Sequence, residues 1–392
     1  MEERKKISKQ HIYKRKIDKS NRLKLNLNNK IRNPGIDFLR ILGMIDIGTF
    51  HIIQKAKKFN KYYKYLKLTE VLTKWHISTF GVISGIVGYK SHKYSNLLYL
   101  WLSAVFYSLL NHFFVKTFYP DKVMPNVKLI KYFFPVVFKE YWYITTYFRM
   151  YLFLPLINKN ISSITKSELF IINLSIFGIL FIWRDLMQDE SEVNNKFYQR
   201  SALTLLSYYI LGSYIGKFVI NKNQNRNIFY YLTLISLYAL VSYSTYYLRY
   251  SGVTISNKAL LLLKKLFHDN INSIAMIIET ISITLIFTQI KYNKLISKII
   301  TYIGPLAFSF YLINSNWDVK RTLYRGLYDK YSYDLPFIKL LLIFLCIVIK
   351  RFCISIFIDY FRNLLFKILR IKNICIFIET FIKNKFKKIF KE

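Results

Sequence analysis

Long apolar runs recur along this chain, and they constrain its fold more than any other feature. From Ile36 to the neighbourhood of Asp359, runs long enough to cross a bilayer alternate with short polar loops, and 53% of the residues are hydrophobic. In a helix, about 20 mostly apolar residues span the hydrocarbon core of a membrane. A soluble chain of this length would instead need two domains with polar surfaces. The sequence therefore predicts an all-α, polytopic bundle of membrane-spanning helices.

About ten segments have the length and composition of transmembrane helices. An even number of spans places both termini on one side, and the basic tails favour the cytoplasmic side. The loops alone favour the opposite orientation, because those on the far side carry more Lys and Arg. The predicted segments are Arg32–Gln54, Trp75–Tyr89, Ser95–Val115, Glu140–Asn158, Leu169–Trp183, Leu203–Val219, Ile228–Tyr247, Ile271–Ile290, Tyr302–Ser315 and Pro336–Ile358.

These segments divide the chain into three parts. Residues 1–34 form a basic cytoplasmic tail without an apolar core, so no cleavable signal peptide is expected. Residues 35–358 form the transmembrane domain. Residues 359–392 form a basic tail with apolar residues at helical spacing, which is typical of a helix lying on the inner leaflet.

The chain carries a formal net charge of +38 at pH 7. Such an excess is common in nucleic-acid-binding proteins, but here the cations are spread over tails and loops between apolar segments. The expected partners are therefore anionic membrane lipids and anionic substrates, and not nucleic acid. The spacing of Cys346, Cys353 and Cys375 fits neither a disulfide framework nor a metal site, so no metal is expected.

The first apolar segment contains four ionisable residues, Asp37, Arg40, Asp46 and His51, and such groups are costly at membrane depth. Arg40 and His51 are eleven positions apart, which at about 100° per residue brings them to within roughly 20° of one helix face and about 16 Å apart along the axis. Asp37 shares that face, which should line a protein interior or a water-filled cavity. Simpler interpretations stay open: an Asp37–Arg40 ion pair that snorkels to the headgroups, Arg40 as a lipid anchor, or His51 as a neutral hydrogen-bonding residue between helices.

Four short motifs occur in order along the apolar segments. The first segment reads DFLR, then ten residues, then His51; the second contains FGVISG at 80–85; the fourth reads WYITTYFRMYLFLPLIN at 142–158; the ninth contains FYLIN at 310–314. Together they resemble the membrane-bound acyltransferase family 3, whose first helix carries an Arg-x10-His signature. The resemblance covers roughly residues 32–358.

This resemblance implies an integral membrane O-acyltransferase of the cell membrane. The acyl donor would be acyl-coenzyme A, usually acetyl-CoA, approached from the cytoplasmic side as a co-substrate, with no permanently bound cofactor. The acceptor would be a sugar hydroxyl of a cell-surface polysaccharide or of its lipid-linked precursor. Direct transfer and transfer through an acyl-histidine both stay open.

Acyl transfer to a hydroxyl needs a base for the proton and positive charge near the thioester oxygen. His51 suits the first role because imidazole accepts protons near neutral pH, and Arg40 suits the second because guanidinium is always charged. Among the other candidates, Glu279 is expected to be protonated or paired with Arg149 or His51. The aromatic candidates are equally typical of an interfacial belt or of packing. The candidates for donor or substrate binding are Asp37, Ser84, Trp142, Tyr143, Tyr147, Arg149, Glu279 and Asn314.

The chain also departs from the family pattern. Asn314 stands where the family has His, Ser78 where relatives often carry Asn, and only Lys90, His92 and Lys93 stand in a turn that usually holds several arginines. A catalytically inactive relative that acts as a scaffold is therefore one alternative. A non-enzymatic multi-span transporter or flippase for glycans or lipids is another.

Small residues recur at helical spacing in two of the segments. Gly81, Gly85 and Gly88 share the second segment, and Gly212 and Gly216 share the sixth. Because glycine lets helix backbones approach closely, this spacing predicts close packing of these helices against neighbours.

Overall fold

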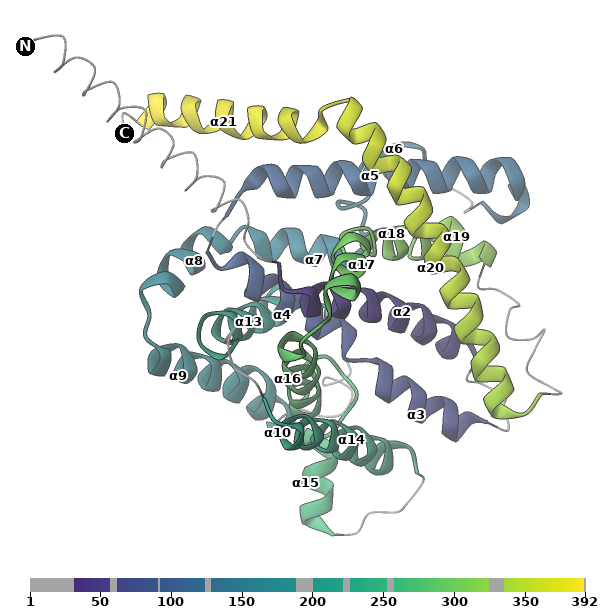
Figure 1. Cartoon of the computed structure of the whole chain (residues 1–392), viewed down its shortest axis with the longest axis vertical. Coiled ribbons are helices and arrows are strands. Elements are labelled where there is room, and N and C mark those ends of the chain that lie inside the picture. The colour runs from purple at the N-terminus through teal and green to yellow at the C-terminus, as the bar shows by residue number, and fades with distance from the viewer. Residues whose placement is uncertain are drawn as a thin grey trace, which may run out of the picture.

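The structure is a computed structural model that describes residues 32–56, 62–90, 92–123, 128–187, 200–220, 226–251, 257–323 and 335–390. These parts of the chain contain helices, turns and irregular segments and no strand, so the predicted all-α fold is confirmed. Figure 1 shows the helices gathered into one bundle, with α2 near its centre and α21 at its edge. Residues 1–31 of the predicted basic tail lie outside the described residues.

The described helices are named here in chain order. Their bounds are α2 Pro34–Ala56, α3 Tyr63–Thr73, α4 His76–Gly88, α5 Tyr94–Phe118, η1 Pro120–Lys122, α6 Ile130–Phe133, α7 Trp142–Tyr151, α8 Leu154–Ser163, α9 Lys166–Phe177, η2 Gly178–Trp183, α10 Arg184–Met187, α13 Ala202–Tyr214, η3 Ile215–Val219, α14 Ile228–Tyr250, α15 Lys258–Leu266, α16 Ile274–Gln289, α17 Lys294–Ile303, α18 Phe308–Asn314, α19 Trp317–Leu323, α20 Phe337–Ile368 and α21 Ile371–Phe390.

Within the described residues, six helical runs are long and apolar enough to cross a membrane. The chain is therefore a multi-pass membrane protein. Helix α2 has 23 residues but carries several ionisable groups, while α16 has 16 residues and α4 only 13. The count of ten spans and the cytoplasmic position of both termini stay predictions. The six runs are Tyr94–Phe118, Lys166–Met187, Ala202–Val219, Ile228–Tyr250, Lys294–Asn314 and Phe337–Ile368.

Two predicted segments are broken helices. The segment predicted at 140–158 consists of α7 and α8, and Pro155 lies in the first turn of α8. The segment predicted at 302–315 is interrupted around Pro305, between α17 and α18. Proline lacks the backbone N–H and is tolerated in a first turn but not in a helix interior. The prediction of one continuous helix in each place is therefore wrong, for a reason that the sequence contains.

Two other stretches are more helical than predicted. The loop predicted at 55–74 contains helix α3. The last apolar segment continues to Ile368, so residues 359–368 belong to α20. The following helix, α21, confirms the helical character of the C-terminal tail.

Helix α21 is docked on the bundle through α5. Figure 1 shows its first half alongside the start of α5. The Glu379 carboxylate accepts hydrogen bonds from the backbone N–H groups of Tyr94 at 3.1 Å and Ser95 at 2.9 Å, and so satisfies unpaired donors at the α5 N-terminus. Helix α21 is therefore held by a specific contact with the bundle.

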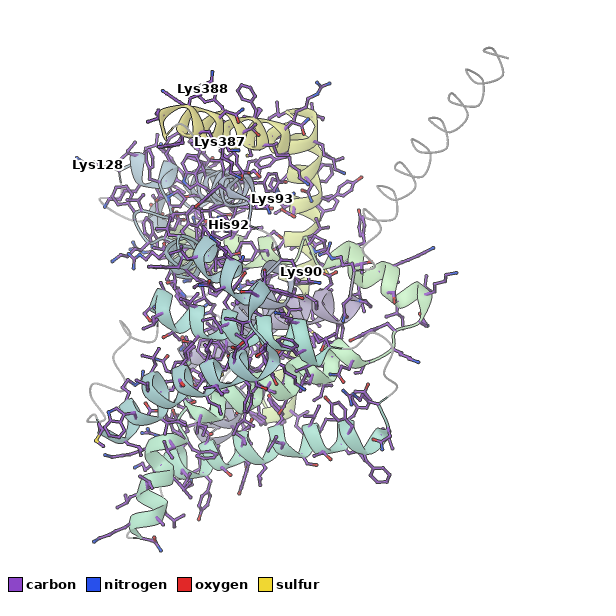
Figure 2. All side chains as sticks on the ribbon, turned by 90° about the vertical axis from the view of Figure 1, so that its left-hand side faces the viewer. Lys90, His92, Lys93, Lys128, Lys387 and Lys388 are labelled. Carbon is purple, nitrogen blue, oxygen red and sulfur yellow. The ribbon has the colours of Figure 1, made fainter. Side chains whose placement is uncertain are left out.

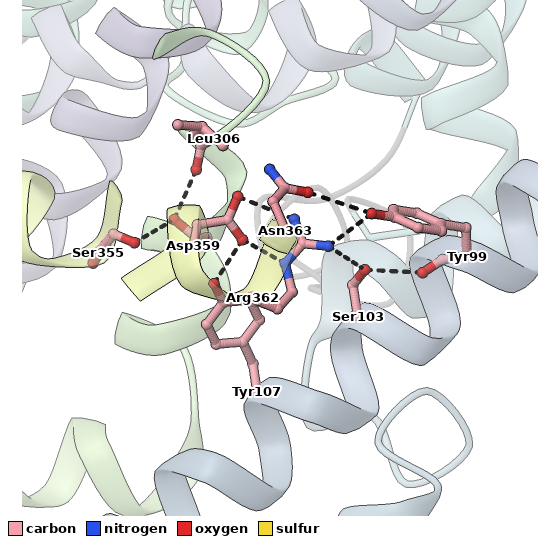
Figure 3. A network of polar contacts seen from close by, with 9 residues as sticks. Tyr99, Ser103, Tyr107, Leu306, Ser355, Asp359, Arg362 and Asn363 are labelled. Atoms are coloured by element: carbon pink, nitrogen blue, oxygen red, sulfur yellow. Dashed lines mark hydrogen bonds and ion pairs between the residues drawn. The ribbon is translucent and has the colours of Figure 1, made fainter. Parts of the chain in front are cut away.

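A buried ion pair fastens α20 to α5. Figure 3 shows Arg362 and Asp359 facing each other, with Nε 2.7 Å from Oδ1 and Nη2 3.1 Å from Oδ2. From α5, the Tyr107 hydroxyl donates to Asp359 at 2.6 Å, and the Tyr99 hydroxyl accepts from Arg362 at 3.0 Å. A charge pair at this depth is tolerated because every partner is hydrogen-bonded.

Helices α4 and α13 approach each other at glycines, which confirms the close packing predicted from spacing. A Cβ atom at Gly85 would lie 2.0 Å from the Tyr209 carbonyl oxygen, and one at Gly212 would lie 2.0 Å from the Val82 carbonyl oxygen. These distances are far below van der Waals contact, so the two backbones leave no room for a side chain. The pair forms the most extensive contact between helices in the described bundle.

We expect Gly212→Ala to destabilise the protein by about 2–3 kcal/mol, because a methyl group would push the α4 backbone away. The matched control is Gly178→Ala, since a Cβ at Gly178 meets no atom within 4 Å, and alanine has the better helix propensity. The measurement is the thermal unfolding midpoint of both variants in detergent. Equal midpoints would contradict the close backbone approach.

Candidate active site

Helix α2 begins in a position fixed by its first residues. The Asn33 side-chain oxygen accepts a hydrogen bond from the Gly35 N–H at 2.9 Å, and Pro34 occupies the first turn, where its missing N–H is not needed. A Cβ at Gly35 would lie 1.9 Å from the Phe287 carbonyl oxygen of α16. The start of α2 is therefore packed directly on α16, which sets the direction of its ionisable face.

Asp37 and Arg40 form the predicted i,i+3 ion pair, and it lies within the protein. Arg40 Nη1 is 2.6 Å from Asp37 Oδ1, and Arg32 Nε is 2.5 Å from Asp37 Oδ2. The Asp37 side chain is 0% exposed and that of Arg40 is 24% exposed. Two guanidinium partners offset the lost hydration of a buried carboxylate. The pair therefore does not snorkel into lipid.

His51 lies in the wall of a cavity of about 250 Å³ near the C-terminal end of α2. Two further candidates, Trp142 and Tyr143 of α7, line the same cavity. The lining residues are Met44, Ile47, Phe50, His51, Gln54, Lys74, His76, Ile77, Phe80, Trp142, Tyr143, Arg200, Asn270, Ile271, Phe308 and Tyr311.

Arg40 does not line this cavity, but polar side chains lie between it and the cavity wall. Arg40 is a near neighbour of Tyr147, and the hydroxyls of Tyr147 and Tyr143 are both within hydrogen-bond reach of the Ser84 hydroxyl. The Tyr143 and Tyr147 rings are stacked with centroids 6.5 Å apart. The structure therefore places Ser84, Tyr143 and Tyr147 between Arg40 and the His51 cavity.

Three other candidates lie elsewhere. Arg149 is exposed on the outer side of α7. Glu279 is buried, but its partner is Ser242 of α14, whose hydroxyl donates at 2.7 Å. The structure therefore gives Glu279 a hydroxyl partner on α14 in place of the expected pairing with Arg149, which is exposed on α7. Asn314 is buried at the end of α18, where its side chain donates to the Phe310 carbonyl oxygen at 2.8 Å. The position of each of these three side chains depends on which face of its helix packs against the rest of the protein.

A comparison with protein families matches residues 33–360 to the acyltransferase domain of acyltransferase family 3. The match covers most of the chain. The chain belongs to the acyltransferase 3 family. Comparisons with curated proteins and with solved structures gave no match. Family membership makes this protein a membrane acyltransferase, so the transporter interpretation is not supported.

The acyltransferase cavity contains residues that the sequence did not single out. His76 at the start of α4, Arg200 before α13 and Tyr311 of α18 all line it. The Arg200 guanidinium lies 4.8 Å from the Trp142 ring centroid, and the Tyr311 hydroxyl accepts a hydrogen bond from the Tyr143 N–H at 3.2 Å. His76 lies four residues before the FGVISG motif, which was a usable signal. Nothing around Arg200 in the sequence marks it.

Lys74 also lines the cavity, and its charge is balanced locally. Its ammonium group lies 2.6 Å from Asp269 Oδ2, in the segment before α16. Burial raises the pKa of Asp269, but the Lys74 ammonium and its hydrogen bond outweigh burial, so the pKa of this carboxyl lies below its ordinary value. The carboxylate is therefore ionised and holds Lys74 at the cavity edge.

Proposed function

We propose that this acyltransferase moves an acyl group, acetyl in the first instance, from acyl-CoA to a sugar hydroxyl of a cell-surface polysaccharide or its lipid-linked precursor. The observation that carries the proposal is the place of His51 in the wall of a cavity, on the same helix as the partly buried Arg40. In the reaction the thioester C–S bond breaks and an ester C–O bond forms. The hydroxyl proton ends on the coenzyme A sulfur.

The shape and lining of the cavity support a sugar as acceptor. Aromatic rings from four helices form its walls, and the flat apolar faces of a sugar pack well against such rings. His51 in its neutral form is positioned to take the proton of a hydroxyl in this space. The aromatic residues that line the cavity are Phe50, Phe80, Trp142, Tyr143, Phe308 and Tyr311.

The donor is assigned to the Arg40 end of the site. A guanidinium offers several N–H donors to a phosphate or to a developing oxyanion, and burial strengthens that interaction. The turn between α4 and α5 adds Lys90, His92 and Lys93, which Figure 2 shows near one another below α21. Tyr151 of α7 is bound to this turn, because its hydroxyl donates to the Lys93 carbonyl oxygen at 2.7 Å. Coenzyme A carries phosphate groups, so the ammonium groups of Lys90 and Lys93 suit the proposed donor. Asp37 keeps Arg40 in place.

The test is an assay on the purified full-length protein in lipid nanodiscs with acetyl-CoA labelled in the acetyl group. We expect release of free coenzyme A thiol that rises when a saccharide acceptor is added, and transfer of the label to that acceptor. Surface glycans from cells with and without the protein, compared by mass spectrometry, should differ by acetyl groups. Absence of thiol release with every acyl-CoA tried would overturn the proposal.

A further inference from the structure

His76 is a second histidine of the cavity, and its proton can be placed. It is the first residue of α4, and the whole residue is only 2% exposed. Its Nδ1 atom lies 2.5 Å from the Thr73 carbonyl oxygen. A carbonyl oxygen only accepts hydrogen bonds, so Nδ1 carries the proton. In the neutral ring, Nε2 is then a hydrogen-bond acceptor.

The Nε2 atom of His76 faces the cavity without a partner. It makes no hydrogen bond in the described parts of the chain, and the atom itself is not fully buried. His76 itself lines the cavity. A polar atom that is nearly buried and unpaired costs about 1–3 kcal/mol. A ligand with a hydroxyl group would remove that cost by donating to Nε2.

His76 and His51 both lie close to one aromatic ring. The Phe50 ring centroid is 5.8 Å from the His51 ring and 5.6 Å from the His76 ring. Both imidazoles line the same cavity. A sugar ring carries several hydroxyls on a rigid frame, so one hydroxyl can meet His51 while another reaches His76.

We propose that His76 is an acceptor-binding residue whose Nε2 accepts a hydrogen bond from a second hydroxyl of the sugar and so selects which hydroxyl His51 acylates. This inference rests on the proposed function. It predicts that the acceptor is a polyol with at least two hydroxyls in the cavity and that the acylated position is set by the pair of histidines. His51 remains the base, and His76 binds and orients.

Two substitutions distinguish the roles of the two ring nitrogen atoms of His76. His76→Asn places an amide near the position of Nδ1, so the bond to Thr73 can form, but nothing replaces Nε2. His76→Gln extends the amide to the position of Nε2 and offers an acceptor oxygen there. The methyl pyranosides of glucose, galactose, mannose and N-acetylglucosamine are first compared as acceptors with the wild type. The glycoside that is acetylated fastest is then the acceptor probe. The monodeoxy analogues of that glycoside complete the set.

We expect His76→Asn to raise the KM for the glycoside about tenfold, as for the loss of one hydrogen bond to a buried group, and His76→Gln to restore most of it. The monodeoxy analogue that lacks the hydroxyl bound by His76 should have a KM with the wild type about tenfold above that of the parent glycoside. With His76→Asn, the KM for this analogue should not exceed the KM for the parent glycoside. The Asn variant should also acetylate a mixture of positions, read by NMR of the product.

The outcomes are distinct. Additive effects of His76→Asn and of every deoxy analogue, or equal losses in the Asn and Gln variants, would show that His76 is structural and overturn the inference while the proposed function stands. A wild type that releases thiol with no glycoside of the panel would count against the proposed function and the inference together.

Discussion

Replacement of His51 by glutamine should abolish acetyl transfer to a sugar acceptor, with a fall in rate of at least about a hundredfold, because a positioned general base contributes about 10²–10⁴. Glutamine keeps a polar side chain of similar reach in the cavity wall but cannot take up a proton at neutral pH. The measurement is thiol release from acetyl-CoA with a saccharide present. The control is Thr49→Ser on the same helix, because serine can keep the hydrogen bond to the Ile45 carbonyl oxygen, now 3.1 Å long.

A His51→Gln protein that folds like the wild type and keeps its transfer rate would remove His51 from the base role. His76 would then be the remaining histidine of the cavity, and the double variant would show whether it carries the reaction. If His51→Gln loses acetyl transfer completely while Thr49→Ser stays active, the base role belongs to His51 alone. The comparison thus separates the two histidines by function.

The part of the candidate site that the sequence can group together lies on one helix. Helical periodicity places Asp37, Arg40 and His51 on one face of α2. It does not show that His51 lines the cavity while Arg40 does not. The ion pair between Asp37 and Arg40 also follows from local spacing alone. What the periodicity could not give was the depth of burial of that pair, since this depends on the α16 and α17 backbones packed against the start of α2.

The contributions of other helices could not be predicted in the same way. Arg149 lies in the middle of an apolar segment, yet it points outward because the opposite face of α7 packs on α13. Glu279 pairs with Ser242, which is 37 residues away in the sequence. His76 and Arg200 reach the cavity from separate segments. The position of each of these residues depends on which other helix packs against its own. The periodicity of a single segment does not identify that neighbouring helix.

The broken helices show a different limit. Pro155 and Pro305 are visible in the sequence, and both coincide with interruptions of predicted spans. Hydropathy averaged over a window hides them, because the residues on each side are apolar. Local proline rules would have divided these segments. The break between α17 and α18 matters for the site, because α18 does not continue α17 and its residues Phe308 and Tyr311 line the cavity.

Replacement of Arg40 by alanine should lower kcat/KM for acetyl-CoA by about 10- to 100-fold, the range expected for loss of a charged hydrogen-bond donor. The loss should not come from misfolding, because Asp37 would still have Arg32, whose Nε lies 2.5 Å from its carboxylate. Arg40→Lys keeps the charge but not the planar fork of donors, so we expect an intermediate loss. The measurement is the dependence of thiol release on acetyl-CoA concentration.

The matched control for Arg40 is Arg149→Ala, which removes the same side chain from an exposed position on α7. If positive charge on this protein acted only through the general attraction of an anionic donor, both variants would lose activity alike and salt would reduce the difference from the wild type. If the partly buried guanidinium of Arg40 binds the donor directly, Arg40→Ala alone should lose activity, and added salt should not restore it. Equal losses would therefore refute a donor-binding role for Arg40, and they would shift that role to the exposed cations.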